Sequence, residues 1–195
     1  MRWMLCALLL VCAAATPAAV PTPLPRDSLY QLDAPLTDQA GRPLTLATKR
    51  GTAQVVVMFY TSCSYICPTI IDTVLDLDRK LTPAERARLG VLLISLDPRR
   101  DDPAALRATA EKRGLDLTRW TLAQPRPGDV RALAGVLGVR FRLLADGEIN
   151  HTGALMLLDA EGRVVAASDK TSGVVDPVFL TRVRSLVAPA ASPRP

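Results

Sequence analysis

The chain has 195 residues, of which 49% are hydrophobic and 22% charged, with a formal net charge of +5. This length fits one domain of ordinary size with a sizeable core and is too short for two domains of that size. Basic residues are scattered among acidic ones, and aromatic residues make up only 4% of the chain. The composition therefore argues against nucleic-acid binding and indicates a mildly basic, solvated surface that would suit an acidic partner.

Residues 1–19 are predicted to be a secretory signal peptide. Met1-Arg2 supplies a positive start, an apolar run fills 3–15, and small residues follow, with cleavage after Ala15 or Ala19. The run is shorter than the ~20 residues of a membrane-spanning helix, which disfavours a retained anchor. Cys12 weakly matches a lipid-attachment site, so a tether through the N-terminus stays open. We expect an exported, periplasmic protein, soluble or membrane-tethered.

The rest of the chain divides into a linker, one domain and a tail. Residues 20–26 are Pro-rich and are expected to be an extended linker rather than part of the core. Residues 27–187 form the predicted folded domain. The tail at 188–195 is rich in Ala and Pro and is predicted to be disordered. We find no internal repeat.

Strands and helices are predicted to alternate through the domain. The strongest signals are two apolar runs, 54–60 (QVVVMFY) and 91–96 (VLLISL), typical of central strands covered on both faces. Capping residues followed by proline at Thr82-Pro83 and Asp102-Pro103 predict helix starts. In chain order, we expect strands at 28–32, 43–46, 54–60, 91–96, 120–123, 139–144, 154–158 and 163–167, and helices from the TSCSYICP segment (61–68) to about 79, from 82, and over 102–114, 129–138 and 176–187. This order indicates an α/β fold with a mixed central sheet flanked by helices.

Two cysteines remain once the signal peptide is set aside, Cys63 and Cys67. A bridge between them would close so short a loop that it would stabilise little, so the pair indicates chemistry rather than structure. They lie between a buried strand and a helix start, at the sheet edge where α/β proteins place their sites. The positive end of the helix there favours thiolates, which both disulfide exchange and soft-metal binding require.

The spacing of the pair leaves three interpretations open. The redox motif of thioredoxins is Cys-x-x-Cys, one residue shorter, and the wider Cys-x-x-x-Cys suits a metal between the sulfurs. On spacing alone, redox chemistry and metal binding are balanced, with an inert disulfide bond as a third reading. His151, the only histidine, favours the metal, because the loop before the strand 154–158 should approach the same sheet edge. Two thiolates and one imidazole suit Cu(I), or Cu(II) if oxygen ligands join, whereas zinc would prefer a fourth protein ligand.

Three segments resemble the Sco/SenC family of copper proteins: FYTSCSYICPT (59–69), SLDPRRDDP (95–103) and NHTGALMLLD (150–159). The resemblance implies a thioredoxin-like fold, copper bound by two cysteines and one histidine, and delivery of copper to the CuA site of cytochrome c oxidase. Carried onto this chain, the implied metal ligands are Cys63, Cys67 and His151. Asp97 matches a family position near the site and would orient the ligands without binding the metal.

The resemblance predicts a copper metallochaperone, whose partner is the copper-binding subunit of cytochrome c oxidase or another copper chaperone. The alternative is a thiol–disulfide oxidoreductase that keeps partner cysteines reduced for copper loading, and a copper-sensing role is a third candidate. Two departures from known patterns stand out. Residues 64–66, between the cysteines, are neutral where family members commonly carry acidic residues. No proline precedes the strand after His151, where thioredoxins place their cis-proline, which argues against general oxidoreductase activity.

Overall fold

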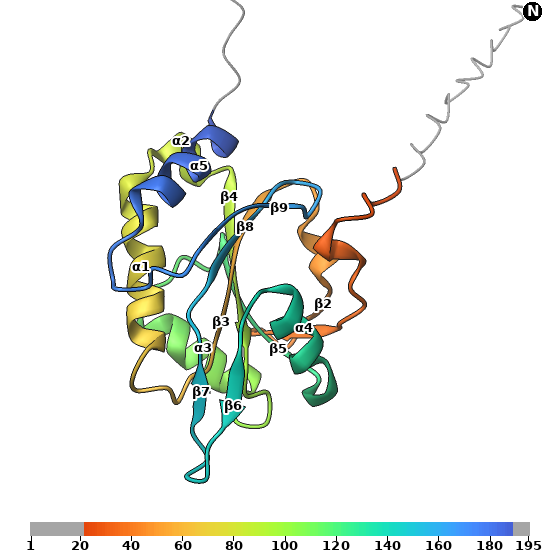
Figure 1. Cartoon of the computed structure of the whole chain (residues 1–195), viewed down its shortest axis with the longest axis vertical. Helices are drawn as coiled ribbons and strands as arrows, with labels where there is room; N and C mark the ends of the chain where they lie inside the picture. Colours follow the sequence, from red (N-terminus) through yellow and green to blue (C-terminus); the bar gives the residue numbers. More distant parts are fainter. Residues whose placement is uncertain (1–21, 189–195) are drawn as a thin grey trace, which may run out of the picture.

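A computed structural model of the chain describes residues 22–188 (Figure 1). The predicted signal peptide, the start of the linker and nearly all of the tail lie outside these residues. Within the described part of the chain, no helix has the length and apolar character needed to cross a bilayer.

A seven-stranded mixed sheet forms the centre of the fold. Its strands run in the order β2–β1–β5–β4–β3–β8–β9. The three central strands β3, β4 and β5 are parallel, and every other neighbouring pair is antiparallel. The strand bounds are β1 (Leu36–Asp38), β2 (Pro43–Leu44), β3 (Ala53–Phe59), β4 (Leu89–Ser95), β5 (Trp120–Pro125), β8 (Leu155–Leu158) and β9 (Val164–Ser168). Every residue of β3 and β4 is buried, which confirms the two apolar runs as central strands.

Helices cover both faces of this sheet. Three helices lie on one side: α1 (Cys67–Lys80), α3 (Pro103–Lys112) and α5 (Pro177–Val187). The helix α4 (Val130–Val136) lies on the other side (Figure 1). A short helix, α2 (Pro83–Arg86), precedes β4. The buried side chains of α1 recur at helical spacing, Ile70, Val74 and Leu77 among them, so one stripe of the helix packs on the sheet.

The predicted helix starts are confirmed by their caps. The carboxylate of Asp102 accepts a hydrogen bond from the N–H of Ala105 at 2.8 Å, with proline at the first helical position of α3. Thr82 and Glu85 cap α2 reciprocally. Each cap satisfies backbone N–H groups that have no partner within the helix.

Two expected strands near the start of the domain are wrong in type or extent. Residues 28–32 contain a 3₁₀ helix, Leu29–Gln31, because the Ser28 hydroxyl accepts the N–H of Tyr30 and turns the chain. The strand expected at 43–46 is limited to Pro43–Leu44, and a second 3₁₀ helix, Leu46–Lys49, follows it. A third, Pro127–Asp129, leads into α4.

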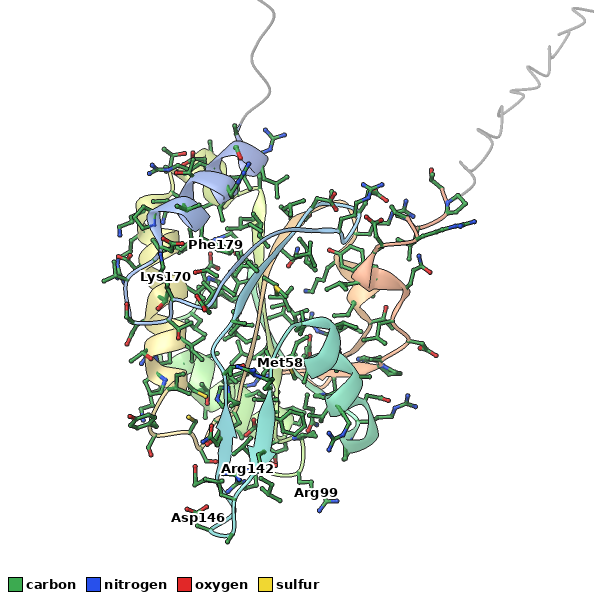
Figure 2. The ribbon with its side chains drawn as sticks, in the orientation of Figure 1. Met58, Arg99, Arg142, Asp146, Lys170 and Phe179 are labelled. Atoms are coloured by element: carbon green, nitrogen blue, oxygen red, sulfur yellow. The ribbon has the colours of Figure 1, made fainter. Side chains whose placement is uncertain are left out.

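The strand expected at 139–144 is present over 141–143, but its pairing in a two-stranded sheet outside the central one was not predicted. This sheet pairs β6 (Phe141–Leu143) with β7 (Ile149–His151) in antiparallel register. The hairpin projects at one end of the molecule, where Figure 2 shows Arg142, Asp146 and Arg99, while Met58 and Phe179 lie in the interior. The last residue of this hairpin is His151, so the hairpin positions the histidine singled out from the sequence.

Candidate metal centre

The two cysteines lie where β3 gives way to α1. Cys63 is in the turn after β3, with its N–H donating to the carbonyl of Tyr60 at 3.3 Å, and Cys67 is the first residue of α1. The helix therefore starts near the end of the segment 61–68 that was expected to open it, and Cys63 precedes the helix. Both thiols are buried, and the N–H of Cys67 donates to the Sγ of Cys63 at 3.4 Å. The positive end of α1 thus points at the sulfur of Cys63, whereas the sequence analysis expected it to favour the thiolate at both cysteines.

The imidazole of His151 reaches the second sulfur. Its Nε2 lies 3.3 Å from the Sγ of Cys67, and its Nδ1 lies 3.2 Å from the carbonyl oxygen of Thr152. A carbonyl oxygen only accepts, so this contact is satisfied when Nδ1 carries the proton. The lone pair of Nε2 then points toward the sulfurs, in the orientation that a metal ligand needs. His151 ends β7 and is not in a loop, but it does approach the predicted sheet edge.

The structure brings all three predicted residues together. One ligand atom from each of Cys63, Cys67 and His151 lies within 4.8 Å of the other two, and all three residues are buried. With metal–ligand bonds of about 2.0–2.3 Å, three ligand atoms spread evenly around one ion lie about 3.5–4.0 Å apart, so small side-chain adjustments would bring the three atoms to a common ion. The spacing is therefore close to that of a three-ligand site, and the donors are those preferred by soft metal ions.

Burial and hydrogen bonding separate the acidities of the two thiols. Burial raises the pKa of Cys63, but hydrogen bonds from Cys67, Tyr65 and Tyr60 together outweigh it and hold that pKa below its usual value. Burial raises the pKa of Cys67 far above its usual range. Burial also lowers the pKa of His151, which favours the neutral imidazole that binds metals. Negative charge is therefore concentrated on Cys63, beside the start of α1.

A tyrosine that the sequence analysis did not single out ties the hairpin to the cysteine segment. The hydroxyl of Tyr60 donates to the carboxylate of Glu148 at 2.9 Å and accepts from the N–H of Ile149 at 3.3 Å. Its ring meets that of His151 edge-on, with 5.7 Å between the ring centroids. The signal in the sequence was a residue with a polar group ending an otherwise apolar buried strand, since buried tyrosine hydroxyls usually find a partner.

A buried carboxylate, that of Asp101, also holds the segment between β3 and Cys63 in place. Asp101 is fully buried and accepts from both the N–H and the hydroxyl of Thr61 and from the hydroxyl of Ser95. Asp97 lies elsewhere, with its carboxylate paired to Arg100. Among the described residues, no hydrogen bond joins the Asp97 side chain to the three candidate ligands, and its orienting role stays a prediction.

The site opens onto a cleft of about 350 Å³. Cys63 and His151 line it, together with Tyr60, Glu148 and Tyr65, and the side chain of Tyr65 is 91% exposed. The ligand atoms are buried but lie beside open space, so an ion can reach them without unfolding of the core.

A family model described as SCO1/SenC matches residues 27–186. The chain belongs to the SCO1/SenC family. This SCO1/SenC protein is 28% identical over 146 residues to a protein of Stutzerimonas stutzeri provisionally named for copper binding, a match that covers 71% of this chain and 68% of the relative.

Solved structures of other SCO1/SenC proteins share the fold. A family lipoprotein from Bacillus anthracis superposes with a TM-score of 0.69 at 23% identity, covering 83% of this chain and 98% of that one. Copper-bound ScoI of Bradyrhizobium japonicum superposes with a TM-score of 0.62 at 24% identity, covering 77% of this chain and 96% of that one. These likenesses confirm the predicted thioredoxin-like fold.

Proposed function

We propose that this SCO1/SenC protein is a copper metallochaperone that binds one copper ion through Cys63, Cys67 and His151. The observation that carries the proposal is the convergence of the two sulfurs and one imidazole nitrogen within 4.8 Å in a buried site. Copper-bound and copper-named relatives in the same family support this choice of metal. The donor set suits Cu(I), and Cu(II) binds when oxygen ligands complete its coordination.

The chain's own residues account for capture of the ion. Cys63 supplies a thiolate, stabilised by the N–H of Cys67. Cys67 holds its proton in the empty site and gives it up when the ion arrives, because only the thiolate is a metal ligand. His151 contributes the lone pair of Nε2 while Thr152 holds its other ring nitrogen. The cleft beside the site then allows passage of the ion to a second protein.

The proposal also names the compartment in which copper is delivered and the protein that receives it. Export through the segment 1–19 places the domain in the periplasm, soluble or tethered by its N-terminus, and the recipient is the CuA site of cytochrome c oxidase or another copper chaperone. Family membership supports this recipient. A buried ligand set beside an open cleft supports transfer over permanent storage, because the ligands are accessible from one side.

Copper titration of single variants tests the ligand set. We expect the wild type to bind one copper ion with a sulfur-to-Cu(II) charge-transfer band, and His151→Ala to lose the band or weaken binding markedly. Asn150→Ala is the matched control, because residue 150 precedes the histidine on the same strand and is exposed, whereas His151 is buried. If His151→Ala binds Cu(II) with unchanged affinity and spectrum, the ligand assignment is wrong.

Thiol–disulfide exchange is the second candidate function, favoured by the lowered pKa of Cys63 and the adjacent Cys67. Residues 22–188 contain no cis peptide bond and so lack the cis-proline of thioredoxins. The discriminating measurements are the reduction potential of the pair and its rate of exchange with an oxidised partner peptide. Copper transfer that is lost in His151→Ala while exchange persists supports the metallochaperone; oxidase assembly that survives in that variant supports the oxidoreductase.

A further inference from the structure

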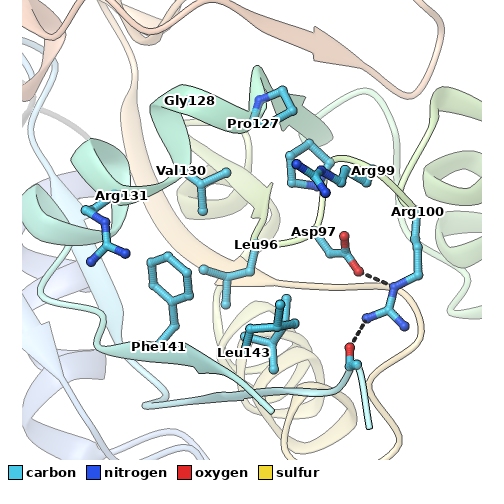
Figure 3. Close-up of a pocket in the computed structure, with 13 residues that line it drawn as sticks. Leu96, Asp97, Arg99, Arg100, Pro127, Gly128, Val130, Arg131, Phe141 and Leu143 are labelled. Atoms are coloured by element: carbon cyan, nitrogen blue, oxygen red, sulfur yellow. Dashed lines mark hydrogen bonds and ion pairs between the residues drawn. The ribbon is translucent and has the colours of Figure 1, made fainter. Parts of the chain in front are cut away.

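A larger groove lies beside the metal cleft. Its volume is about 660 Å³, against about 350 Å³ for the cleft. Figure 3 shows its floor, where Leu96 after β4, Val130 of α4, and Phe141 and Leu143 of β6 come together from three segments of the chain. Leu143 is 68% exposed although it sits in a strand. Leu96 and Val130 are buried and Phe141 is half-buried, so Leu143 supplies most of the apolar surface that a partner would cover.

The groove and the metal site share one face of the β6–β7 hairpin. In its antiparallel register, Phe141 is opposite His151 and Leu143 is opposite Ile149. Residues directly opposite one another point to the same face, so the wall of the groove continues into the strand end that carries the imidazole. Ile149 lines both cavities. Anything bound in the groove therefore lies next to the metal ligands.

The groove is positively charged. Three arginines line it, Arg99, Arg100 and Arg131, against a single carboxylate, Asp97. Arg100 is occupied, because it pairs with Asp97 and donates to a backbone carbonyl of the hairpin. Arg99 and Arg131 form no ion pair with any described residue, and Arg131 lies over the ring of Phe141 at 5.8 Å. Figure 3 shows them on opposite sides of the apolar floor.

We propose that this groove docks an acidic segment of the protein that exchanges copper with the site. Apolar side chains of the segment cover Phe141 and Leu143, and its carboxylates pair with Arg99 and Arg131. The charge of the groove selects an acidic occupant, and its position brings the partner's metal ligands to the cleft at Cys63 and His151. The inference rests on the proposed function, since it names the chemistry of the partner of the same site.

Three fluorescent synthetic peptides test the groove by anisotropy against the full mature protein. One alternates leucine with aspartate, the second replaces every aspartate by lysine, and the third replaces every leucine by serine. We expect the leucine–aspartate peptide alone to bind well, and binding to weaken as salt is raised. The double variant Arg99→Glu/Arg131→Glu should bind it at least about tenfold more weakly, since two favourable ion pairs become repulsions. Leu143→Asp should weaken it as well.

The matched control is Arg107→Glu/Arg182→Glu, which makes the same change of charge at two exposed arginines outside the groove. This variant should bind the peptide within about twofold of the wild type. Equal binding of the lysine peptide, equal loss in both double variants, or binding of none of the three peptides would overturn the proposal. A self-association of the wild type that the groove variant abolishes would assign the groove to a second copy and would equally overturn it.

The same samples separate this inference from the proposed function. Arg99→Glu/Arg131→Glu should retain the copper stoichiometry and charge-transfer band of the wild type, because neither arginine is among the three ligands. Unchanged peptide binding with normal copper binding contradicts only the groove. Absence of copper binding in the wild type contradicts the metallochaperone, whatever the peptides do.

Discussion

Replacing Asp101 by asparagine tests whether the buried carboxylate holds the segment that leads into Cys63. The carboxylate is fully buried and accepts three hydrogen bonds: from the Thr61 N–H at 3.2 Å, from its hydroxyl at 2.5 Å, and from the Ser95 hydroxyl at 2.6 Å. An asparagine amide fills the same space but offers one acceptor oxygen and one NH₂ group. The NH₂ group would then face groups that now act as donors.

The expected loss of stability follows from the hydrogen bonds that the asparagine amide cannot accept. A hydrogen bond to a charged group contributes about 1.5–3 kcal/mol, and one or two of them are lost. Burial raises the pKa of Asp101, so the native carboxylate already carries a desolvation penalty that the neutral amide avoids. The difference leaves a destabilisation of about 1–3 kcal/mol. With a urea dependence of about 2 kcal/mol per molar, the unfolding midpoint should fall by about 0.5–1.5 M.

The neighbouring residue supplies the control for a urea titration followed by circular dichroism. Asp102 carries the same side chain but caps α3 at the surface, accepting from the N–H of Ala105 at 2.8 Å. Asparagine caps a helix about as well as aspartate, so Asp102→Asn should stay within about 0.5 kcal/mol of the wild type. Equal midpoints for Asp101→Asn and Asp102→Asn would refute the argument that the buried network stabilises this segment.

Three further outcomes follow. Gly162→Ala should lower the thermal midpoint more than Gly41→Ala: both glycines have positive φ, 81° and 76°, but only at Gly162 would the added Cβ meet an aromatic ring, at 2.6 Å. Burial raises the pKa of Asp38, but hydrogen bonds from two backbone N–H groups and a guanidinium hold it below its usual value. The ionised carboxylate therefore stabilises the fold at pH values above its pKa in the unfolded chain, and this stabilisation is lost as the pH falls through its pKa in the folded protein. Asp38→Asn should thus be less stable than the wild type at pH 7, and the difference in stability should narrow below about pH 4. Tyr60→Phe should speed amide exchange at Ile149, measured by NMR, because the hydroxyl accepts that N–H at 3.3 Å; an unchanged rate would show that the bond does not hold the hairpin.

Local sequence patterns were enough to predict those strands and helices whose signal lies within a few consecutive residues. The runs 54–60 and 91–96 are apolar apart from Gln54, Ser95 and the hydroxyl of Tyr60, as is typical of strands covered on both faces, and both are central in the sheet. The start of α1 was predicted only to lie within the segment 61–68. Pro68 is tolerated in the first turn of a helix and not in its interior, and the helix does start just before it, at Cys67.

Long-range contacts could not be derived in this way. The strands of the β6–β7 hairpin have three residues each and no alternation of apolar and polar residues strong enough to predict pairing. The bond between Tyr60 and Glu148 joins positions 88 apart in the chain, and only the folded structure brings them together. The convergence of the two cysteines with His151 was predicted from the order of the elements, which brings the segment before the strand 154–158 to the sheet edge at Cys63 and Cys67, and the family resemblance implied the same three residues.

The pairing of β6 with β7 makes the site sensitive to a shift by one position. Neighbouring residues along a strand face opposite ways, so sliding β7 by a single step against β6 would turn the imidazole outward and present the Asn150 amide to the sulfurs instead. An amide is a poor ligand for a soft ion. A change of length at the hairpin tip therefore preserves the site only if Phe141 still faces His151 across the ladder.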